Sequence, residues 1–413
     1  MPEKGKAMPP QALAGVKVAD FTWAVAGAMV TKCLADYGAT VVRIESRKHP
    51  DFLRTSGPYK DGKPGPNRTG YFGFFNPNKH SIVIEMDHPG SRDVLRRIIS
   101  WADVVAENFT PGVMEKHGLD YTHLKEINPG IIMLSTSGQG QTGPFSRVSI
   151  GGNWLVGLTG FGWFTGWPDG EVTQPFGAYN DLITPRFGVL GVVAALRYRE
   201  RTGRGQYIDL SQLEAGAQFL MPPLLDYTVN GHEGGRTGNT SPYAAPHGVY
   251  PCLDERWCAL AVCSDAEWQA FCRVIGKPEL GKDPRFATLP DRKHSEDVLN
   301  QMVSEWTVKL SPDEVMRRLQ AEDIAAGVVE NARDLVEDPQ LAHRNYFWKM
   351  PHPEMGDFAH MGEAATLSRT PPQPRMPSPG MGEHTEYVCK KILGMSDEEY
   401  LAGLCGGVFG DHD

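Results

Sequence analysis

The chain has 413 residues, of which 40% are hydrophobic and 22% are charged, and its formal net charge is −9. This length suffices for more than one domain with a large core. Lys and Arg are not concentrated in any stretch, which argues against a nucleic-acid partner, although an acidic protein can still hold an anionic ligand in a local basic pocket.

The first third of the chain alternates short apolar strands with helices. The very beginning lacks the apolar region of a secretory signal and no later apolar run could span a bilayer, so we expect a cytoplasmic protein without membrane contact. Strands are expected at residues 16–21, 40–45, 81–85, 103–106 and 131–136, and helices at 26–37 and 89–101. This order predicts a parallel sheet covered by helices, a Rossmann-like α/β domain whose functional edge lies at the carboxyl ends of its strands.

Two Gly-rich segments follow the last of these strands. Gly138-Gln-Gly-Gln-Thr-Gly143 matches G-x-G-x-x-G, but no clear helix follows it and no acidic residue ends a next strand, which disfavours an NAD-dependent oxidoreductase. Glycines also surround the aromatic residues of segment 151–167, which are Trp154, Phe161, Trp163, Phe164 and Trp167. Such a segment forms either an apolar pocket with a few polar groups or a satellite core cluster.

Asp181 ends the stretch Gly177-Ala-Tyr-Asn-Asp181, just before the next expected helix. Thr184 is typical of an N-cap and Pro185 of a first helical residue, where a missing N–H costs nothing. A carboxylate in a loop beside a helix N-terminus is favoured as an anion. The local pattern alone favours a simple capping or turn aspartate, so a catalytic role depends on the wider context.

The remaining chain predicts a smaller unit and a C-terminal segment. The expected elements are a strand at 207–210, a helix at 212–226, a strand at 257–262, and helices at 266–275, 295–310, 312–322 and 386–393. The Pro-rich run 370–382 should be extended. We therefore expect a large Rossmann-like domain over residues 1–228, a smaller α+β domain over 229–345 and a C-terminal segment over 346–413. The seven cysteines lack C-x-x-C spacing, which predicts neither disulfides nor a metal site.

Many collinear stretches resemble the class III CoA-transferases, the family of formyl-CoA and carnitine CoA-transferases. They include Asn180-Asp181 with the later Arg-Thr-Gly-Arg-Gly-Gln206, and the stretches 13–22, 38–45, 76–82, 102–112, 137–144 and 283–288. The resemblance extends along nearly the whole chain. It implies that the large domain binds CoA, that the C-terminal segment returns to this domain, and that two ring-like subunits interlock as a homodimer or pair with a related subunit.

The resemblance also implies how the chain binds its substrates. CoA would be a substrate rather than a permanently bound cofactor, and the partners would be acyl-CoA and small carboxylic acids. The residues that fall where the family contacts CoA are Val25, Ala26, Asn108, Phe109 and Lys116. Arg47 and Arg54 follow the second expected strand and suit phosphate, although a solvated basic loop explains each equally well. Asp87 stands where some relatives carry a CoA-binding lysine, which makes that contact doubtful here.

Segment 151–167 coincides with the family's substrate loop. The resemblance therefore favours a bulky or aromatic acyl pocket with contributions from Asn153, Trp154 and Trp163. Parts of the chain are similar to transferases that act on aryl-substituted succinates such as benzylsuccinate. Succinyl-CoA, a common donor in the family, is the plausible donor.

The implied reaction is nucleophilic acyl transfer through Asp181. Its carboxylate would attack an acyl-CoA thioester, giving an aspartyl anhydride and then an aspartyl-CoA thioester. One alternative is an α-methylacyl-CoA racemase, whose family has a Gly-His-Asp motif where this chain has Gly151-Gly-Asn153. The other alternative is a non-catalytic CoA-binding subunit of a heteromeric transferase, which the presence of Asp181 disfavours.

Overall fold

The computed structural model describes residues 10–410. These residues form two compact units, of which the first comprises residues 10–161, 175–225 and 340–410 and the second comprises 162–174 and 226–339. The boundaries expected after residues 228 and 345 stay a prediction. No helix among the described residues is long and apolar enough to cross a bilayer.

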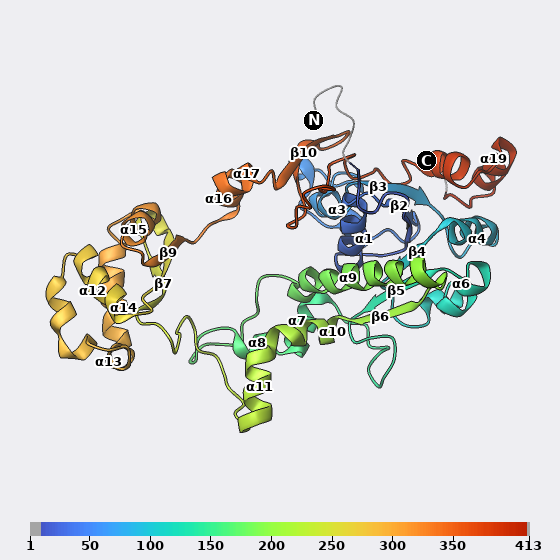
Figure 1. Cartoon of the computed structure of the whole chain (residues 1–413). Helices are drawn as coiled ribbons and strands as arrows, with labels where there is room; N and C mark the ends of the chain where they lie inside the picture. Colours follow the sequence, from blue (N-terminus) through green and yellow to red (C-terminus); the bar gives the residue numbers. More distant parts are fainter. Residues whose placement is uncertain (1–9, 411–413) are drawn as a thin grey trace. The chain divides into compact units, whose positions relative to one another are not determined.

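A parallel sheet of six strands lies at the centre of the first unit (Figure 1). Its strands are β1 (Lys17–Asp20), β2 (Thr40–Glu45), β3 (Lys79–Val83), β4 (Val104–Glu107), β5 (Ile132–Ser137) and β6 (Tyr207–Ser211). They are arranged in the order β3-β2-β1-β4-β5-β6. Strands β1 to β3 are added toward one edge of the sheet and β4 to β6 toward the other, so the strand order switches between β1 and β4. Ligands of such sheets bind at this switch point, beyond the carboxyl ends of the strands. The predicted Rossmann-like fold is confirmed.

Helices cover both faces of this sheet. Helices α1 (Ala26–Asp36) and α9 (Tyr179–Thr202) pack on one face, where Val18 and Leu134 belong to their hydrophobic cluster. Helices α4 (Ser91–Trp101) and α6 (Tyr121–Ile127) pack on the other face with the neighbouring residues Ala19 and Met133. Because successive side chains of a strand point to opposite faces, a buried parallel strand needs apolar residues at nearly every position.

The C-terminal segment also belongs to the first unit. It contains the hairpin of β10 (Phe347–His352) and β11 (Gly356–Met361), then the helices α18 (Thr385–Tyr387), a π-helical turn (Val388–Ile392) and α19 (Asp397–Cys405). The N–H of His384 donates to the carbonyl of Ser81 in β3. Val388 and Phe409 enter the cluster under α4 and α6. Residues after the Pro-rich run thus complete the core at one edge of the sheet.

Several short helices connect the strands or line the carboxyl edge of the first unit. They are α2 (Phe52–Thr55), α3 (Gly70–Phe75), α5 (Val113–Lys116), α7 (Gly152–Thr159) and α10 (Gln212–Ala217). Two further helices, α8 (Phe161–Phe164) and α11 (Met221–Asn230), cross from one unit to the other.

The second unit has its own antiparallel sheet and its own core. The sheet contains β7 (His247–Pro251), β8 (Trp257–Ala261) and β9 (Ala325–Val328), with β8 in the middle. Its helices are α12 (Asp265–Val274), α13 (Leu289–His294), α14 (Glu296–Thr307), α15 (Pro312–Gln320) and α16 (Ala332–Glu337), and α17 (Pro339–His343) follows at the boundary of the unit. Inside it, the Trp268 ring contacts the rings of Phe271 and Phe286.

Two expectations about the middle of the chain are wrong. The helix expected to begin after Thr184 begins at Tyr179, so Thr184 is not its N-cap and Pro185 lies inside it. Pro185 lies beyond the first turn of α9, where proline removes the helical hydrogen bond to the carbonyl of Asp181 and crowds that carbonyl. Segment 151–167 is also not a continuous loop, because α7 and α8 lie within it. Leu155, Val156 and Thr159 are buried on one side of α7.

Candidate active site

Asp181 lies in the first turn of α9, where the helix dipole favours a negative charge. The preceding residue anchors it: Asn180 is fully buried, and its side-chain Nδ2 donates to Thr159 Oγ1 at 3.0 Å and to the carbonyl of Gln212 at 2.9 Å. Pro185 has no N–H and so cannot close the helical hydrogen bond to the carbonyl of Asp181. The backbone of Asp181 is therefore fixed by its neighbour rather than by a regular helical turn.

The carboxylate of Asp181 is held in a confined place. Burial raises the pKa of Asp181 to about 6, and a hydrogen bond with the Gln212 side chain acts in the opposite direction. The first residue of α7, Gly152, lies against it: a Cβ added at Gly152 would be 2.6 Å from Asp181 Oδ2 and 2.3 Å from Ala178 Cβ. Only glycine fits there, and its helix N-terminus adds a second favourable dipole beside the carboxylate. Asp181 is thus a carboxylate that ionises at neutral pH and has little freedom to move.

The switch point of the sheet is clamped by Asn108. Its side chain accepts from the N–H of Trp23 and donates to the carbonyl of Trp23, both at 2.7 Å. Phe109 contacts the Trp23 ring edge to face, with 5.5 Å between the ring centroids. The loops after β1 and β4, which were both expected to contact CoA, are therefore tied together.

The loop after β1 ends in a helix with free N–H groups. Helix α1 begins at Ala26, and its N-cap Val25 has no side-chain capping bond among the described residues. Ala24 has a φ of 53°, which is unusual for a residue with a Cβ, and its N–H donates to Asp51 Oδ1 at 3.0 Å. The uncapped N–H groups of the first turn of α1 can bind an anion.

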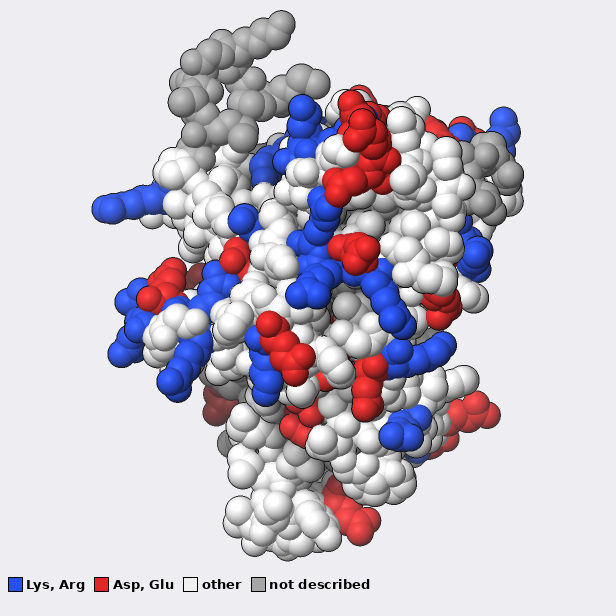
Figure 2. All heavy atoms as spheres, turned by 90° about the vertical axis from the view of Figure 1, so that its right-hand side faces the viewer, with Lys and Arg blue, Asp and Glu red and all other residues white. Residues whose placement is uncertain are grey.

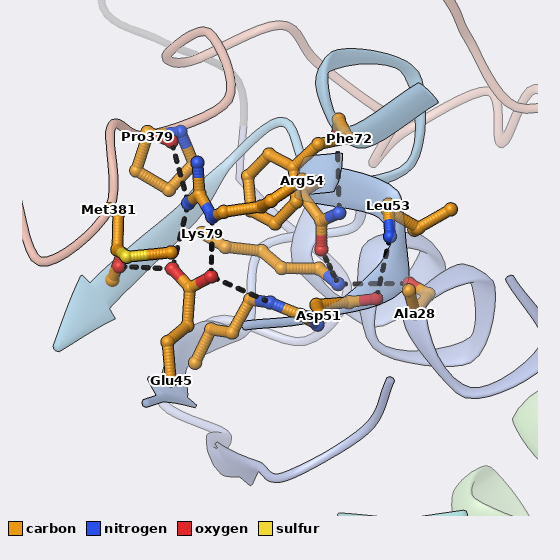
Figure 3. A network of polar contacts seen from close by, with 12 residues as sticks. Ala28, Glu45, Asp51, Leu53, Arg54, Phe72, Lys79, Pro379 and Met381 are labelled. Carbon is orange, nitrogen blue, oxygen red and sulfur yellow. Dashed lines mark hydrogen bonds and ion pairs between the residues drawn. The ribbon is translucent and has the colours of Figure 1, made fainter. Parts of the chain in front are cut away.

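A buried network of charges lies beneath these loops (Figure 3). It consists of the carboxylates of Asp20, Glu45 and Asp51 and the cations of Arg43, Arg54 and Lys79, all nearly inaccessible to solvent. Lys79 donates to Asp20 Oδ2 at 3.1 Å, and Arg43 pairs with Asp51. Because opposite charges balance, each buried ion has a partner, and removal of one would leave another uncompensated.

Arg54 is committed to this network. Its guanidinium donates to both oxygens of Glu45, at 2.6 and 2.7 Å, and also to the carbonyls of Pro66 and Pro379 and to Asn67. Its N–H groups are therefore occupied by the protein, and the centroid of the Phe72 ring lies 3.4 Å from the guanidinium carbon. The predicted contact of Arg54 with a phosphate stays untested, but in this arrangement Arg54 holds the C-terminal segment against the loop after β2.

Arg47 and Lys116 remain accessible. Arg47 is exposed and lines a cavity of about 570 Å³ together with Lys48 and Met381. Lys116, also exposed, lines a cavity of about 630 Å³, where its Nζ is 3.7 Å from Asp87. Each can approach a phosphate from solvent.

Further basic residues surround Lys116. Arg92, Arg96 and His117 line the same cavity. Figure 2 shows one face of the molecule, on which basic side chains gather near the middle with acidic side chains between them. The net charge of the protein is negative, but this face offers local cations to an anionic ligand.

The predicted acyl-pocket residues are divided between the two units. Asn153 and Trp154 are exposed on α7, and Phe161 is buried with its ring 5.1 Å from that of Tyr179. Trp163 belongs to the second unit, where its indole N–H donates to the carbonyl of Gly234. The pocket therefore stays a prediction; the indoles of Trp154, Trp163 and Trp167 are all exposed.

Two residues beside Asp181 were not found by sequence analysis. Gly152 was noted only within Gly151-Gly-Asn153, where the racemase family has Gly-His-Asp, and not as a neighbour of Asp181. Gln212 was placed inside an ordinary helix, yet it is a polar residue directly after a strand at the functional edge, which is a usable signal. Within residues 10–410, no group of three or more His, Cys, Asp or Glu could hold a metal ion.

Comparison with known proteins agrees with this architecture. The model of CoA-transferase family III matches residues 13–385. The chain is 30% identical to the succinyl-CoA–D-citramalate CoA-transferase of Chloroflexus aurantiacus, over 95% of this chain and 96% of that protein. It is 32% identical to the beta subunit of the succinyl-CoA–L-malate CoA-transferase of the same organism, over 94% and 95%. A crystal structure of a CAIB/BAIF family protein from Brucella suis superposes with a TM-score of 0.86 at 30% identity, covering 93% of this chain and all of that one.

Proposed function

The chain belongs to CoA-transferase family III and is a CoA-transferase, and on this premise we propose that it transfers CoA from succinyl-CoA to a dicarboxylic acid with Asp181 as the covalent nucleophile. The observation that carries the proposal is the confined, ionisable carboxylate at the start of α9, next to the N-terminus of α7. An alternative as a racemase is weaker, because Gly151-Gly-Asn153 offers no second proton-transfer group.

The reaction proceeds by exchange of acyl groups on Asp181. Its carboxylate oxygen attacks the succinyl-CoA carbonyl and the C–S bond breaks. CoA thiolate departs, and Asp181 is left as an aspartyl-succinyl anhydride. The thiolate attacks the aspartyl carbonyl, which releases succinate and forms an aspartyl-CoA thioester. The acceptor carboxylate then attacks this thioester, which releases CoA thiolate and forms a second anhydride between Asp181 and the acceptor. The thiolate attacks the acceptor's carbonyl in this anhydride and forms the new CoA thioester. Asp181 is regenerated as a carboxylate, so the cycle needs no oxidant and no net proton.

CoA is proposed to bind along the carboxyl edge of the first unit. The uncapped start of α1 at Val25 and Ala26 would receive a phosphate or the adenine, and Asn108 and Phe109 hold this loop in place. Arg47 and Lys116 would bind the phosphates from their cavities.

Arg47 and Lys116 lie outside the buried network, so each can reach a ligand without breaking an ion pair of the core. Arg54 is different, because phosphate binding would require it to release Glu45. We therefore assign Arg54 a supporting role beneath the site.

The acceptor is proposed to be a substituted succinate. The relatives described above are named for citramalate and malate, both short dicarboxylates, and for succinyl-CoA. The exposed indole of Trp154, on the same helix as Gly152, favours a larger, aryl-substituted acid such as benzylsuccinate. For assembly we propose a homodimer or a heteromer with a related subunit, since one relative is itself named as a beta subunit.

A direct transfer assay tests this proposal. The protein is incubated with succinyl-CoA and either citramalate, malate or benzylsuccinate, and new CoA thioesters are separated and identified. We expect product with at least one acid and none with Asp181→Ala, since loss of a covalent nucleophile costs several orders of magnitude. Trp154→Ala should reduce kcat/KM for benzylsuccinate by about 10- to 200-fold and spare malate. Activity of Asp181→Ala within tenfold of wild type would contradict the nucleophile, and equal losses for both acids would contradict the aryl pocket.

A further inference from the structure

Gln212 occupies a defined place beside the nucleophile. It is the first residue of α10 and follows Ser211, the last residue of β6, whose register partner is Ser137 at the end of β5. Ser211 caps α10 by accepting the N–H of Glu214. Gln212 therefore lies at the carboxyl edge of the sheet, and its exposed fraction is only 8%. Burial of a polar side chain costs free energy unless its polar groups form hydrogen bonds, so the contacts of Gln212 need an explanation.

Both ends of Gln212 face the Asn180–Asp181 pair. Its carbonyl accepts the side-chain amide of Asn180 at 2.9 Å, and its side chain hydrogen-bonds with the carboxylate of Asp181. A carboxylate only accepts, so the amide nitrogen of Gln212 is the donor. Its other polar atom, Oε1, is buried and has no hydrogen-bond partner among the described residues. Within the described part of the chain, the side chain of Gln212 therefore hydrogen-bonds with Asp181 alone.

We propose that Gln212 is a second catalytic residue, whose side-chain amide donates first to the attacking carboxylate of Asp181 and then to the oxyanion that forms on the aspartyl group. The proposal rests on the function of Asp181 proposed above. When one carboxylate oxygen of Asp181 becomes acylated, the other becomes the carbonyl oxygen of the anhydride or thioester. Attack by thiolate or by the acceptor carboxylate converts that carbonyl oxygen to an oxyanion. A donor that already faces the carboxylate needs little reorganisation to stabilise this charge.

The same contact acts on the ionisation of the nucleophile. Burial raises the pKa of Asp181 and the Gln212 hydrogen bond lowers it. A hydrogen bond to the charged form favours that form, so its loss must raise the pKa further. The ionised fraction of Asp181 near pH 6 would then fall, whereas at pH 8 it would change little. This pH dependence separates a contact with the carboxylate from a role in packing alone.

The test compares pH profiles of kcat/KM for wild type, Gln212→Met and Gln212→Glu. Methionine keeps the length of glutamine without a donor, and glutamate adds a like charge beside Asp181. We expect kcat of Gln212→Met to fall by about 100- to 1000-fold, as for loss of one oxyanion donor. Its acidic limb should move upward by about one pH unit, and that of Gln212→Glu further. The control Gln218→Met changes a glutamine just beyond α10 and should leave the profile unchanged.

The possible outcomes separate this proposal from the function of Asp181. Trapping of the acyl-enzyme with hydroxylamine is measured in the same samples, together with melting temperatures. An unchanged acidic limb with kcat within tenfold of wild type in Gln212→Met would overturn the role of Gln212 while leaving Asp181 as the nucleophile. A fall in kcat that only matches a loss of folded protein would overturn that role as well. Absence of any trapped Asp181 in an active wild-type enzyme would instead overturn the proposed function itself.

Discussion

Replacement of Gly152 by alanine should disable the nucleophile without touching it. The new Cβ would lie 2.6 Å from Asp181 Oδ2 and 2.3 Å from Ala178 Cβ, whereas ordinary contacts begin at 3.4 Å. Either α7 or the start of α9 must therefore shift by about 1 Å, a displacement that can cost about 100-fold in rate when it misplaces a reacting group. The strain should lower the free energy of unfolding by about 1–3 kcal/mol.

Gly151→Ala is the matched control for this variant. Gly151 precedes Gly152 directly, its φ is −88°, and an added Cβ would meet nothing within 4 Å among the described residues. We expect Gly151→Ala to keep wild-type kcat, and Gly152→Ala to lose about 100-fold with an almost unchanged KM for succinyl-CoA. Transfer rates and melting curves are measured for both. Equal kcat values for the two variants would refute the reasoning that the shape of α7 confines Asp181.

Three further predictions concern the pH profile, the buried network and the phosphate contacts. Wild-type kcat/KM should fall as the pH drops through about 6, because Asp181 attacks as a carboxylate and its pKa is raised to about 6. A plateau of kcat/KM down to about pH 4.5, near the ordinary pKa of a carboxyl group, would contradict this. Asp51→Ala should lower the free energy of unfolding by about 3–5 kcal/mol in urea titrations, since Arg43 would lose its hydrogen-bonded carboxylate. Asp120→Ala, which removes a helix cap and the contact of Asp120 with His123, should cost about 1 kcal/mol. Lys116→Ala should raise KM for succinyl-CoA about tenfold with kcat unchanged, and an unchanged KM would remove Lys116 from the CoA site.

The architecture of the first unit could be predicted because its strands carry a strong signal. Buried parallel strands are apolar at nearly every position, and β2 was expected with the bounds it has, 40–45. The β10–β11 hairpin was missed. Its strand Phe347–His352 mixes Lys349, Pro351 and His352 with apolar residues, so neither an apolar run nor a clear alternation marks it.

The site could be predicted only in part, because its geometry depends on contacts between distant segments. Asp181 was found through its resemblance to a known family, but its position inside α9 was not, since Pro185 usually marks a helix start. Arg54 looked like a free cation after a strand, and only the fold brings Glu45 and Pro379 around it. Gln212 needed knowledge of which face of α10 meets α9. Local sequence specifies elements, whereas burial and partners of a polar side chain come from tertiary packing.

The central claim is that Asp181 becomes covalently acylated during CoA transfer. The enzyme is incubated with succinyl-CoA and hydroxylamine, which converts an activated aspartyl group to a hydroxamate, and the digested protein is examined by mass spectrometry. We predict the modification on the peptide that contains Asp181, only when succinyl-CoA is present, with loss of activity in the same proportion, and no modification in Asp181→Asn. A hydroxamate on any other residue, or full activity during turnover with hydroxylamine and no modified Asp181, would contradict the account.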